Sequence, residues 1–67
     1  MKYSELERKL KELGCYFLKN SKNGHPIWIN PRTRDLIKMG HHKNKEVADG
    51  TLAKILRQAK GGLEEEG

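Results

Sequence analysis

The chain has 67 residues, of which 34% are hydrophobic and 34% are charged, and its formal net charge at pH 7 is +5. A chain this short forms one domain with a thin core and has no room for a deep pocket around a large organic group, so we expect no cofactor. Three of its nine acidic residues are Glu64, Glu65 and Glu66, so residues 1–62 are more basic than the chain as a whole. Such a domain suits a polyanion such as nucleic acid, although a solvated lysine-rich surface has the same composition.

The first predicted element is a helix over residues 4–13. Ser4 and Glu7 have the spacing of a capping box. Gly14 stands where a helix commonly ends in a left-handed residue. Apolar residues recur along this segment at helical spacing, namely Tyr3, Leu6, Leu10 and Leu13. Cys15, the only cysteine, follows in an apolar stretch, so no intramolecular disulfide can form and we expect a buried, reduced thiol.

Three short β-strands are predicted next. Residues 15–19 are β-prone and precede the turn-forming run Asn20–Gly24. The second strand covers Ile27–Ile29 and the third covers Leu36–Met39, with an Asn-Pro turn between them. Two turns between three short strands predict an antiparallel meander. Pro26 cannot donate a hydrogen bond to a sheet, so it belongs at the start of its strand or on an edge.

A second helix is predicted from Asp49 or Thr51 to Ala59, after a polar loop. The order is therefore α-β-β-β-α, and both helices bury their apolar faces most simply on one face of the sheet, which gives a two-layer α+β domain. We expect this domain to cover residues 1–62, with residues 63–67 as an acidic, flexible tail. No apolar run is long enough for a signal peptide or a membrane span, so we expect a cytoplasmic protein without membrane contact.

His25 has the clearest potential for chemistry, because it follows Gly24 where a turn becomes a strand. Imidazole has an unperturbed pKa of ~6.5 and exchanges protons near neutral pH. A neutral imidazole can remove the 2′-hydroxyl proton of RNA, so that this oxygen attacks the adjacent phosphate, and an imidazolium or a neighbouring cation can assist the leaving oxygen. The alternative is an exposed hairpin histidine without a role, since the spacing places no partner beside it.

His41 and His42, together with His25 and Cys15, give only a weak signal for a metal site. Zinc ligands usually come in pairs at short fixed spacings such as C-x₂-C. Adjacent residues of an extended segment point apart, so at most one of the two neighbouring histidines should face His25. We therefore expect no bound metal.

Other residues are candidates for contact with RNA. Alternation along the second strand places Trp28 opposite Ile27 and Ile29, on the sheet face without helices, where it is exposed or covered by a partner. Trp28 and Tyr16 can stack on bases, although core packing is an equal alternative for Tyr16. Cations that can contact phosphate lie on the predicted strands and turns and in the loop before the second helix, namely Lys19, Lys22, Arg32, Arg34, Lys38, Lys43 and Lys45.

In this order and spacing the residues resemble the HicA family, the toxins of HicAB toxin–antitoxin pairs, over nearly the whole chain. The resemblance rests on Gly24-His25 before a strand that ends at Asn30-Pro31, and on Gly50-Thr51-Leu52 opening the last helix. It implies a double-stranded-RNA-binding-domain-like fold and metal-independent cleavage of mRNA that inhibits translation. It also implies a HicB-type antitoxin that covers the active site.

The resemblance makes His25 the catalytic residue and matches His42 to a loop position, where we expect a structural role or contact with substrate. The expected RNA-binding residues are Lys19, Lys22, Gly24, Trp28, Lys38, His42 and Lys43. Two alternatives stay open. One is a non-catalytic RNA-binding module of the same fold, and the other is a protein-interaction domain that docks a partner on its free sheet face through Trp28.

Overall fold

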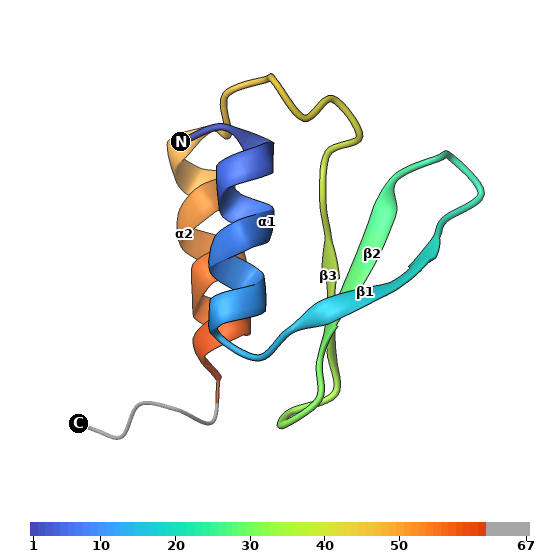
Figure 1. Ribbon diagram of the computed structural model, residues 1–67, viewed down its shortest axis with the longest axis vertical. Helices are drawn as coiled ribbons and strands as arrows, with labels where there is room; N and C mark the ends of the chain where they lie inside the picture. Colours follow the sequence, from blue (N-terminus) through green and yellow to red (C-terminus); the bar gives the residue numbers. More distant parts are fainter. Residues whose placement is uncertain (62–67) are drawn as a thin grey trace.

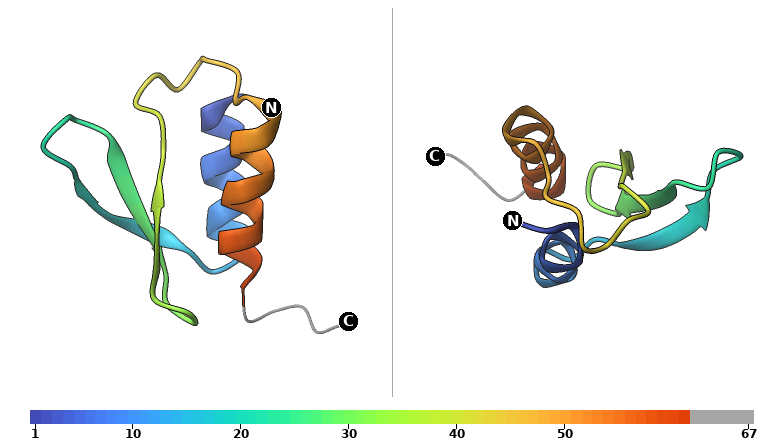
Figure 2. Two further views of the ribbon diagram at one scale, coloured as in Figure 1. Left: turned by 180° about the vertical axis from the view of Figure 1, so that it is seen from behind. Right: turned by 90° about the horizontal axis from the view of Figure 1, so that it is seen from above.

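The computed structural model of the chain describes residues 1–61 (Figure 1). The sheet is antiparallel with strand order β1-β2-β3, and both helices lie side by side on one of its faces (Figure 2). The predicted α-β-β-β-α order and α+β class are confirmed, whereas the predicted tail lies outside the described residues. Neither helix has the length and apolar character needed to cross a membrane. The elements are α1 (Tyr3–Glu12), β1 (Tyr16–Asn20), β2 (Pro26–Asn30), β3 (Asp35–Lys38) and α2 (Asp49–Lys60).

Helix α1 begins earlier than the capping-box spacing predicts. Lys2 is its N-cap, and the Lys2 N–H donates to the Glu5 carboxylate at 2.8 Å. Ser4 lies inside the helix, where its N–H donates to the Lys43 carbonyl at 3.0 Å. The prediction of Ser4 as the cap is therefore wrong, because the loop before α2 supplies acceptors that the local sequence does not contain. This pairing also ties that loop to the start of α1.

Gly14 ends α1 as predicted. Its φ of +91° is the left-handed conformation that glycine adopts without a steric cost. The Gly14 N–H donates to the Lys11 carbonyl at 3.0 Å, and the Cys15 N–H donates to the Leu10 carbonyl at 2.9 Å. These two bonds form a Schellman motif, which satisfies carbonyls that the helix end leaves free. The chain then turns directly into β1.

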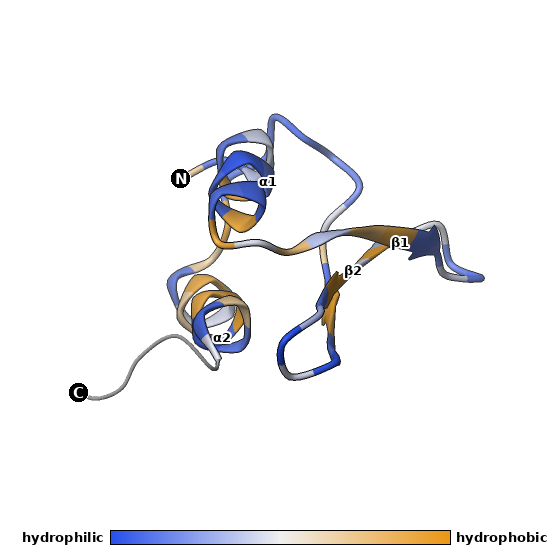
Figure 3. Cartoon of the chain, turned by 60° about the horizontal axis from the view of Figure 1, so that its bottom comes forward, coloured by the Kyte–Doolittle hydropathy of each residue, from blue (hydrophilic) through white to orange (hydrophobic). Residues whose placement is uncertain are grey.

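The core lies between the two helices and the sheet, where the apolar sides of these elements face one another (Figure 3). Cys15 is buried there as predicted, and burial raises the pKa of its thiol, with the charge of Arg32 acting weakly in the opposite direction. A buried thiol of this kind is chemically inert. The buried hydrophobic residues are Leu6, Leu10, Cys15, Trp28, Ile37, Met39, Val47, Ile55 and Ala59.

The predicted position of Trp28 on the free sheet face is wrong, because its side chain is only 3% exposed and faces the helices. Cross-strand partners share a face, and Trp28 pairs with Phe17 on one side and with the buried Ile37 on the other. The alternate row contains Ile27 between Lys19 and Lys38. The row with the large apolar rings therefore covers the core, and the row with the two lysines faces solvent.

Asn30, the last residue of β2, and Arg32, in the β2–β3 turn, hold the C-terminal ends of both helices. The Asn30 side chain is fully buried, and its Nδ2 donates to the Gln58 carbonyl at 2.8 Å. The Arg32 guanidinium donates to the carbonyls of Leu13 and Ala59, each at 2.7 Å. Arg32 therefore caps two helix ends, where a cation is favoured by the helix dipole. This structural role was not predicted from the sequence, where Arg32 was a candidate for contact with phosphate.

Arg34 offers a test of backbone strain, because it is the one non-glycine residue with positive φ (+65°) within residues 1–61. We expect Arg34→Gly to raise the free energy of unfolding by about 0.5–1 kcal/mol, since glycine adopts this conformation without a Cβ clash. Urea unfolding followed by circular dichroism measures the change. Thr33→Gly is the control and should lower stability, because φ at Thr33 is not positive. Equal shifts in both variants would contradict the argument.

Candidate functional site

His25 closes the β1–β2 turn and directly precedes β2. The turn is held by two backbone bonds, from the Gly24 N–H to the Ser21 carbonyl at 3.0 Å and from the Ser21 N–H to the His25 carbonyl at 2.8 Å. The His25 N–H also donates to Ser21 Oγ at 3.2 Å. Gly24 has a φ of +85°, and a Cβ built on it would meet no atom within 4 Å. The glycine is therefore needed for the turn conformation, and the space beside it is open to a ligand.

Three imidazole rings lie in a row at this end of the sheet. The ring centroids of His25 and His41 are 4.7 Å apart, and those of His41 and His42 are 4.4 Å apart. The prediction that at most one of the neighbouring histidines faces the site is wrong. The chain bends at His41, and the Lys45 N–H donates to the His42 carbonyl at 3.1 Å, so the alternation of an extended strand does not apply here.

His25 lies between two hollows of the surface. The first, about 300 Å³, is also lined by His41, His42 and Lys45. The second, about 260 Å³, is also lined by Lys38 and Thr51. Neither hollow has a carboxylate among its lining residues in the described part of the chain. A phosphate beside His25 would therefore meet cations on both sides and no repelling acid.

Tyr3 and Gly40 line both hollows, and neither was a sequence candidate. A Cβ added to Gly40 would lie 2.8 Å from the Tyr3 ring, so the ring packs directly on the glycine backbone. This close packing brings the first turn of α1 to the histidines. The local sequence does not predict this contact, because it indicates only that Tyr3 is the first residue of the apolar stripe of α1.

The pKa of His41 is lowered from its ordinary value. Partial loss of hydration is the largest cause, and the positive charges of His42, His25 and Lys45 act in the same direction. Neighbouring imidazoles compete for a proton in this way because two like charges at short range repel. His41 is therefore neutral over a wider range of pH than a free histidine.

This competition for protons can be measured. We expect His42→Ala to raise the pKa of His41 toward its ordinary value, because the largest of the opposing charges is removed. An NMR titration of the ring Cε1–H signals measures the change, and the chain has only three histidines to assign. Lys22→Ala is the control, since Lys22 is not among the causes of the shift. An unchanged His41 titration in His42→Ala would rule out the charge coupling.

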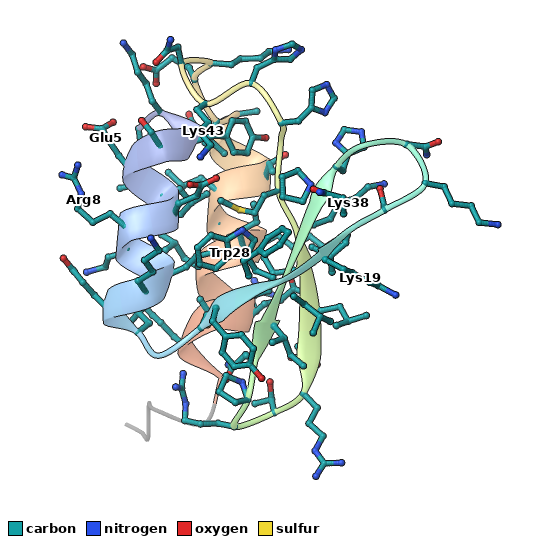
Figure 4. The ribbon with its side chains drawn as sticks, turned by 45° about the vertical axis from the view of Figure 1, so that its right-hand side comes forward. Glu5, Arg8, Lys19, Trp28, Lys38 and Lys43 are labelled. Carbon is teal, nitrogen blue, oxygen red and sulfur yellow. The ribbon has the colours of Figure 1, made fainter. Side chains whose placement is uncertain are left out.

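The other expected RNA-binding residues occupy different surfaces. Lys22 and Gly24 are exposed in the turn beside His25. Lys19 flanks Ile27 opposite Lys38, and it lies on the side of the sheet away from the helices (Figure 4). Lys43 reaches across to α1. Among the expected residues, His42 and Lys38 line the hollows next to His25, whereas Lys43 and Trp28 line another hollow, between α1 and the β1–β2 hairpin.

Within residues 1–61, no group of three or more histidine, cysteine or acidic side chains is arranged to hold a metal ion. The groups that line the hollows at the histidine row include imidazoles and lysines. These supply proton transfer and positive charge, which are the two requirements for breaking a phosphodiester bond of RNA.

Comparison with known proteins places the chain in a family. The chain matches no curated protein and no solved structure. It does match the family model described as the HicA toxin of bacterial toxin–antitoxin systems, over residues 3–60. This match extends from the first turn of α1 to the end of α2 and includes all three histidines. The chain therefore belongs to the HicA toxin family.

Proposed function

We propose that the chain is an endoribonuclease that cleaves messenger RNA and thereby inhibits translation, with His25 as general acid and base. The observation that carries the proposal is the 4.7 Å approach of His25 to a second imidazole, His41. Among residues 1–61, the hollow they share is lined by a lysine and by no carboxylate. Family membership supports a toxin with an RNA target and a cognate antitoxin.

In the proposed reaction, neutral His25 removes the proton of a 2′-hydroxyl. The freed oxygen attacks the adjacent phosphorus, and the bond from phosphorus to the 5′-oxygen breaks. The imidazolium then returns its proton to the leaving 5′-oxygen, so that the products carry a 2′,3′-cyclic phosphate and a 5′-hydroxyl. One histidine can serve both steps if it shuttles the proton, and such acid–base help contributes about 10²–10⁴-fold to the rate.

The neighbouring groups have distinct tasks in this proposal. Lys38 and Lys45 lie in the two hollows that adjoin His25 and stabilise the charge that develops on the phosphate oxygens. His41, whose pKa is lowered, is protonated less readily than a free histidine and so opposes the positive charge on His25 less. We also propose that Lys19, Lys22, Gly24, His42 and Lys43 contact the RNA along this end of the molecule.

The experiment uses a pair of single-stranded RNA oligonucleotides in buffer with EDTA. One is all-ribose, and the other carries 2′-deoxyribose at the nucleotide where the first is cut. We expect cleavage of the all-ribose strand alone, with a 2′,3′-cyclic phosphate on the product. Cleavage of both strands would exclude the 2′-hydroxyl as nucleophile, and cleavage that stops in EDTA would show dependence on a metal. Salt-sensitive binding without cleavage would favour the alternative of a non-catalytic RNA-binding module.

We further propose that the cognate antitoxin is a HicB-type protein that covers the histidine row, and that the pair acts in the cytoplasm, where messenger RNA is translated. Tyr16 and Leu36, each about half exposed on the sheet face without helices, give a protein partner an apolar surface in place of Trp28. The histidine row itself is the surface that must be covered for inhibition. Addition of the antitoxin should stop cleavage and shield the His41 and His42 rings from solvent in NMR spectra.

A further inference from the structure

A separate hollow, about 350 Å³ in volume, lies between α1 and the β1–β2 hairpin. It is larger than either hollow at the histidine row, and the proposed reaction does not use it. Its walls combine two aromatic rings with charged and amide side chains. The residues that matter here are Glu7, Lys11, Phe17, Asn20, Trp28 and Lys43.

The aromatic wall suits a flat ligand. The Phe17 ring is 48% exposed, and its centroid lies 6.5 Å from that of Trp28 at an interplanar angle of 79°. The two rings are nearly perpendicular. A planar group that stacks on the Phe17 ring would therefore have its own plane nearly perpendicular to the Trp28 ring. Phe17 is one of several large apolar side chains that the described chain leaves exposed, and stacking would bury it.

Trp28, which lines this wall, also carries an unpaired hydrogen-bond donor that is buried beneath it. Its side chain is 97% buried by area, and its indole N–H has no acceptor within the described residues. Buried polar groups are nearly always paired, and one without a partner costs about 1–3 kcal/mol.

The charged wall favours an anion. Lys43 Nζ lies 3.5 Å from Glu7 Oε1, and the carboxylate of this pair is the less exposed partner. Lys11 forms no ion pair within residues 1–61, so the wall carries one positive charge in excess. The labelled view shows Lys43 at the upper end of α1 and Trp28 below it, between α1 and the sheet (Figure 4). A planar ring joined to a phosphate could stack on the aromatic wall and bind the lysines of the charged wall.

Two residues that line this hollow are next in sequence to histidines of the row. Pro26, which lines the hollow, directly follows His25, and Lys43 directly follows His42. A strand of RNA with one phosphate at His25 can therefore place a neighbouring nucleotide here.

We propose that this hollow binds one nucleobase of single-stranded RNA, adjacent to the phosphate that His25 acts on. The base stacks on Phe17, with Trp28 closing the wall behind it, and Lys11 and Lys43 contact the flanking phosphate. Asn20 hydrogen-bonds the base edge. This inference rests on the proposed ribonuclease function, and it makes the hollow the place where the enzyme distinguishes one RNA sequence from another.

The test uses 2′-fluoro RNA oligonucleotides, which lack the 2′-hydroxyl and cannot be cleaved by the proposed reaction. Binding is measured by anisotropy of a labelled strand and by the fluorescence of Trp28, the only tryptophan. We expect Phe17→Leu to weaken binding about 5-fold or more, since a stacked base contributes about 1–3 kcal/mol. Tyr16→Leu is the matched control, because Tyr16 is similarly exposed but lies on the opposite face. It should change binding less than about 2-fold.

A scan of abasic positions along the oligonucleotide identifies the bound base. One abasic position should weaken binding to the natural chain but have no further effect in Phe17→Leu. Equal effects of Phe17→Leu and Tyr16→Leu, or no binding of the oligonucleotide, would overturn the inference. Cleavage of ordinary RNA is measured separately. If the natural protein cleaves RNA and Phe17→Leu binds the oligonucleotide normally, the base site is refuted and the proposed activity stands. If the binding results are as expected but the natural protein does not cleave RNA, only the proposed activity is refuted.

Discussion

His25→Ala is expected to slow RNA cleavage by about 10²–10⁴-fold while leaving the fold unchanged, because the substitution removes the group that we propose moves the proton. The side chain lies at the end of a turn, and only its backbone takes part in the hydrogen bonds that hold this turn. Loss of activity would then report on chemistry and not on folding. Single-turnover rates with a labelled RNA measure the effect, and circular dichroism verifies the fold.

Asn23→Ala is the matched control, since Asn23 is an exposed residue of the same turn. Its cleavage rate should stay within about 3-fold of that of the natural chain, which is well below the loss expected for an acid–base group. Equal rates for His25→Ala and the natural chain would remove His25 from the mechanism. Loss of growth inhibition in bacteria that express His25→Ala, compared with Asn23→Ala, tests the same residue in cells.

Asn30→Leu is expected to have the largest effect on stability, a loss of about 2–4 kcal/mol, because it leaves several buried polar groups unpaired. Asn30 Nδ2 lies within hydrogen-bond distance of the carbonyls of Gln58, Ala59 and Gly61. Asn30 Oδ1 accepts the Arg32 N–H at 3.0 Å. A domain of this size has only about 3–5 kcal/mol in total, so the variant should be largely unfolded at moderate temperature.

Urea unfolding with Trp28 fluorescence measures this loss. Asn20→Leu is the control, because Asn20 is exposed, and surface substitutions usually change stability by less than about 0.5 kcal/mol. Asn30→Asp sharpens the test. It keeps an acceptor for the Arg32 N–H but directs a negative charge at the carbonyl end of α2, so it should also be destabilising. A stable Asn30→Leu protein would show that these bonds contribute little.

The element order could be predicted from the sequence, because helical spacing and turn residues are local signals. The face of Trp28 could not. Alternation separates Trp28 from Ile27 and Ile29, but both sets are apolar, so the pattern does not say which set is buried. The answer depends on cross-strand partners, which place Trp28 between Phe17 and Ile37. The register also shifts between Phe17 and Lys19, which no local rule predicts.

The candidate site was predictable only in part. His25 stands out because a glycine turn and a strand start flank it, and those are local features. Its neighbour His41 comes from a bend in a loop, and Tyr3 comes from the start of α1, so their positions depend on the packing of distant segments. The role of Arg32 was missed for the same reason, since its acceptors lie at the ends of both helices.

The two ends of strand β2 have different surroundings. Asn30 and Arg32, at one end, join the strand to both helices, while His25 stands at the other end among exposed side chains. The two residues that anchor β2 to the helix ends and the histidine that we propose acts on RNA therefore lie at opposite ends of this strand. Under the proposed function, substitutions at His25 would therefore alter cleavage of RNA while leaving the anchoring of β2 to both helices intact.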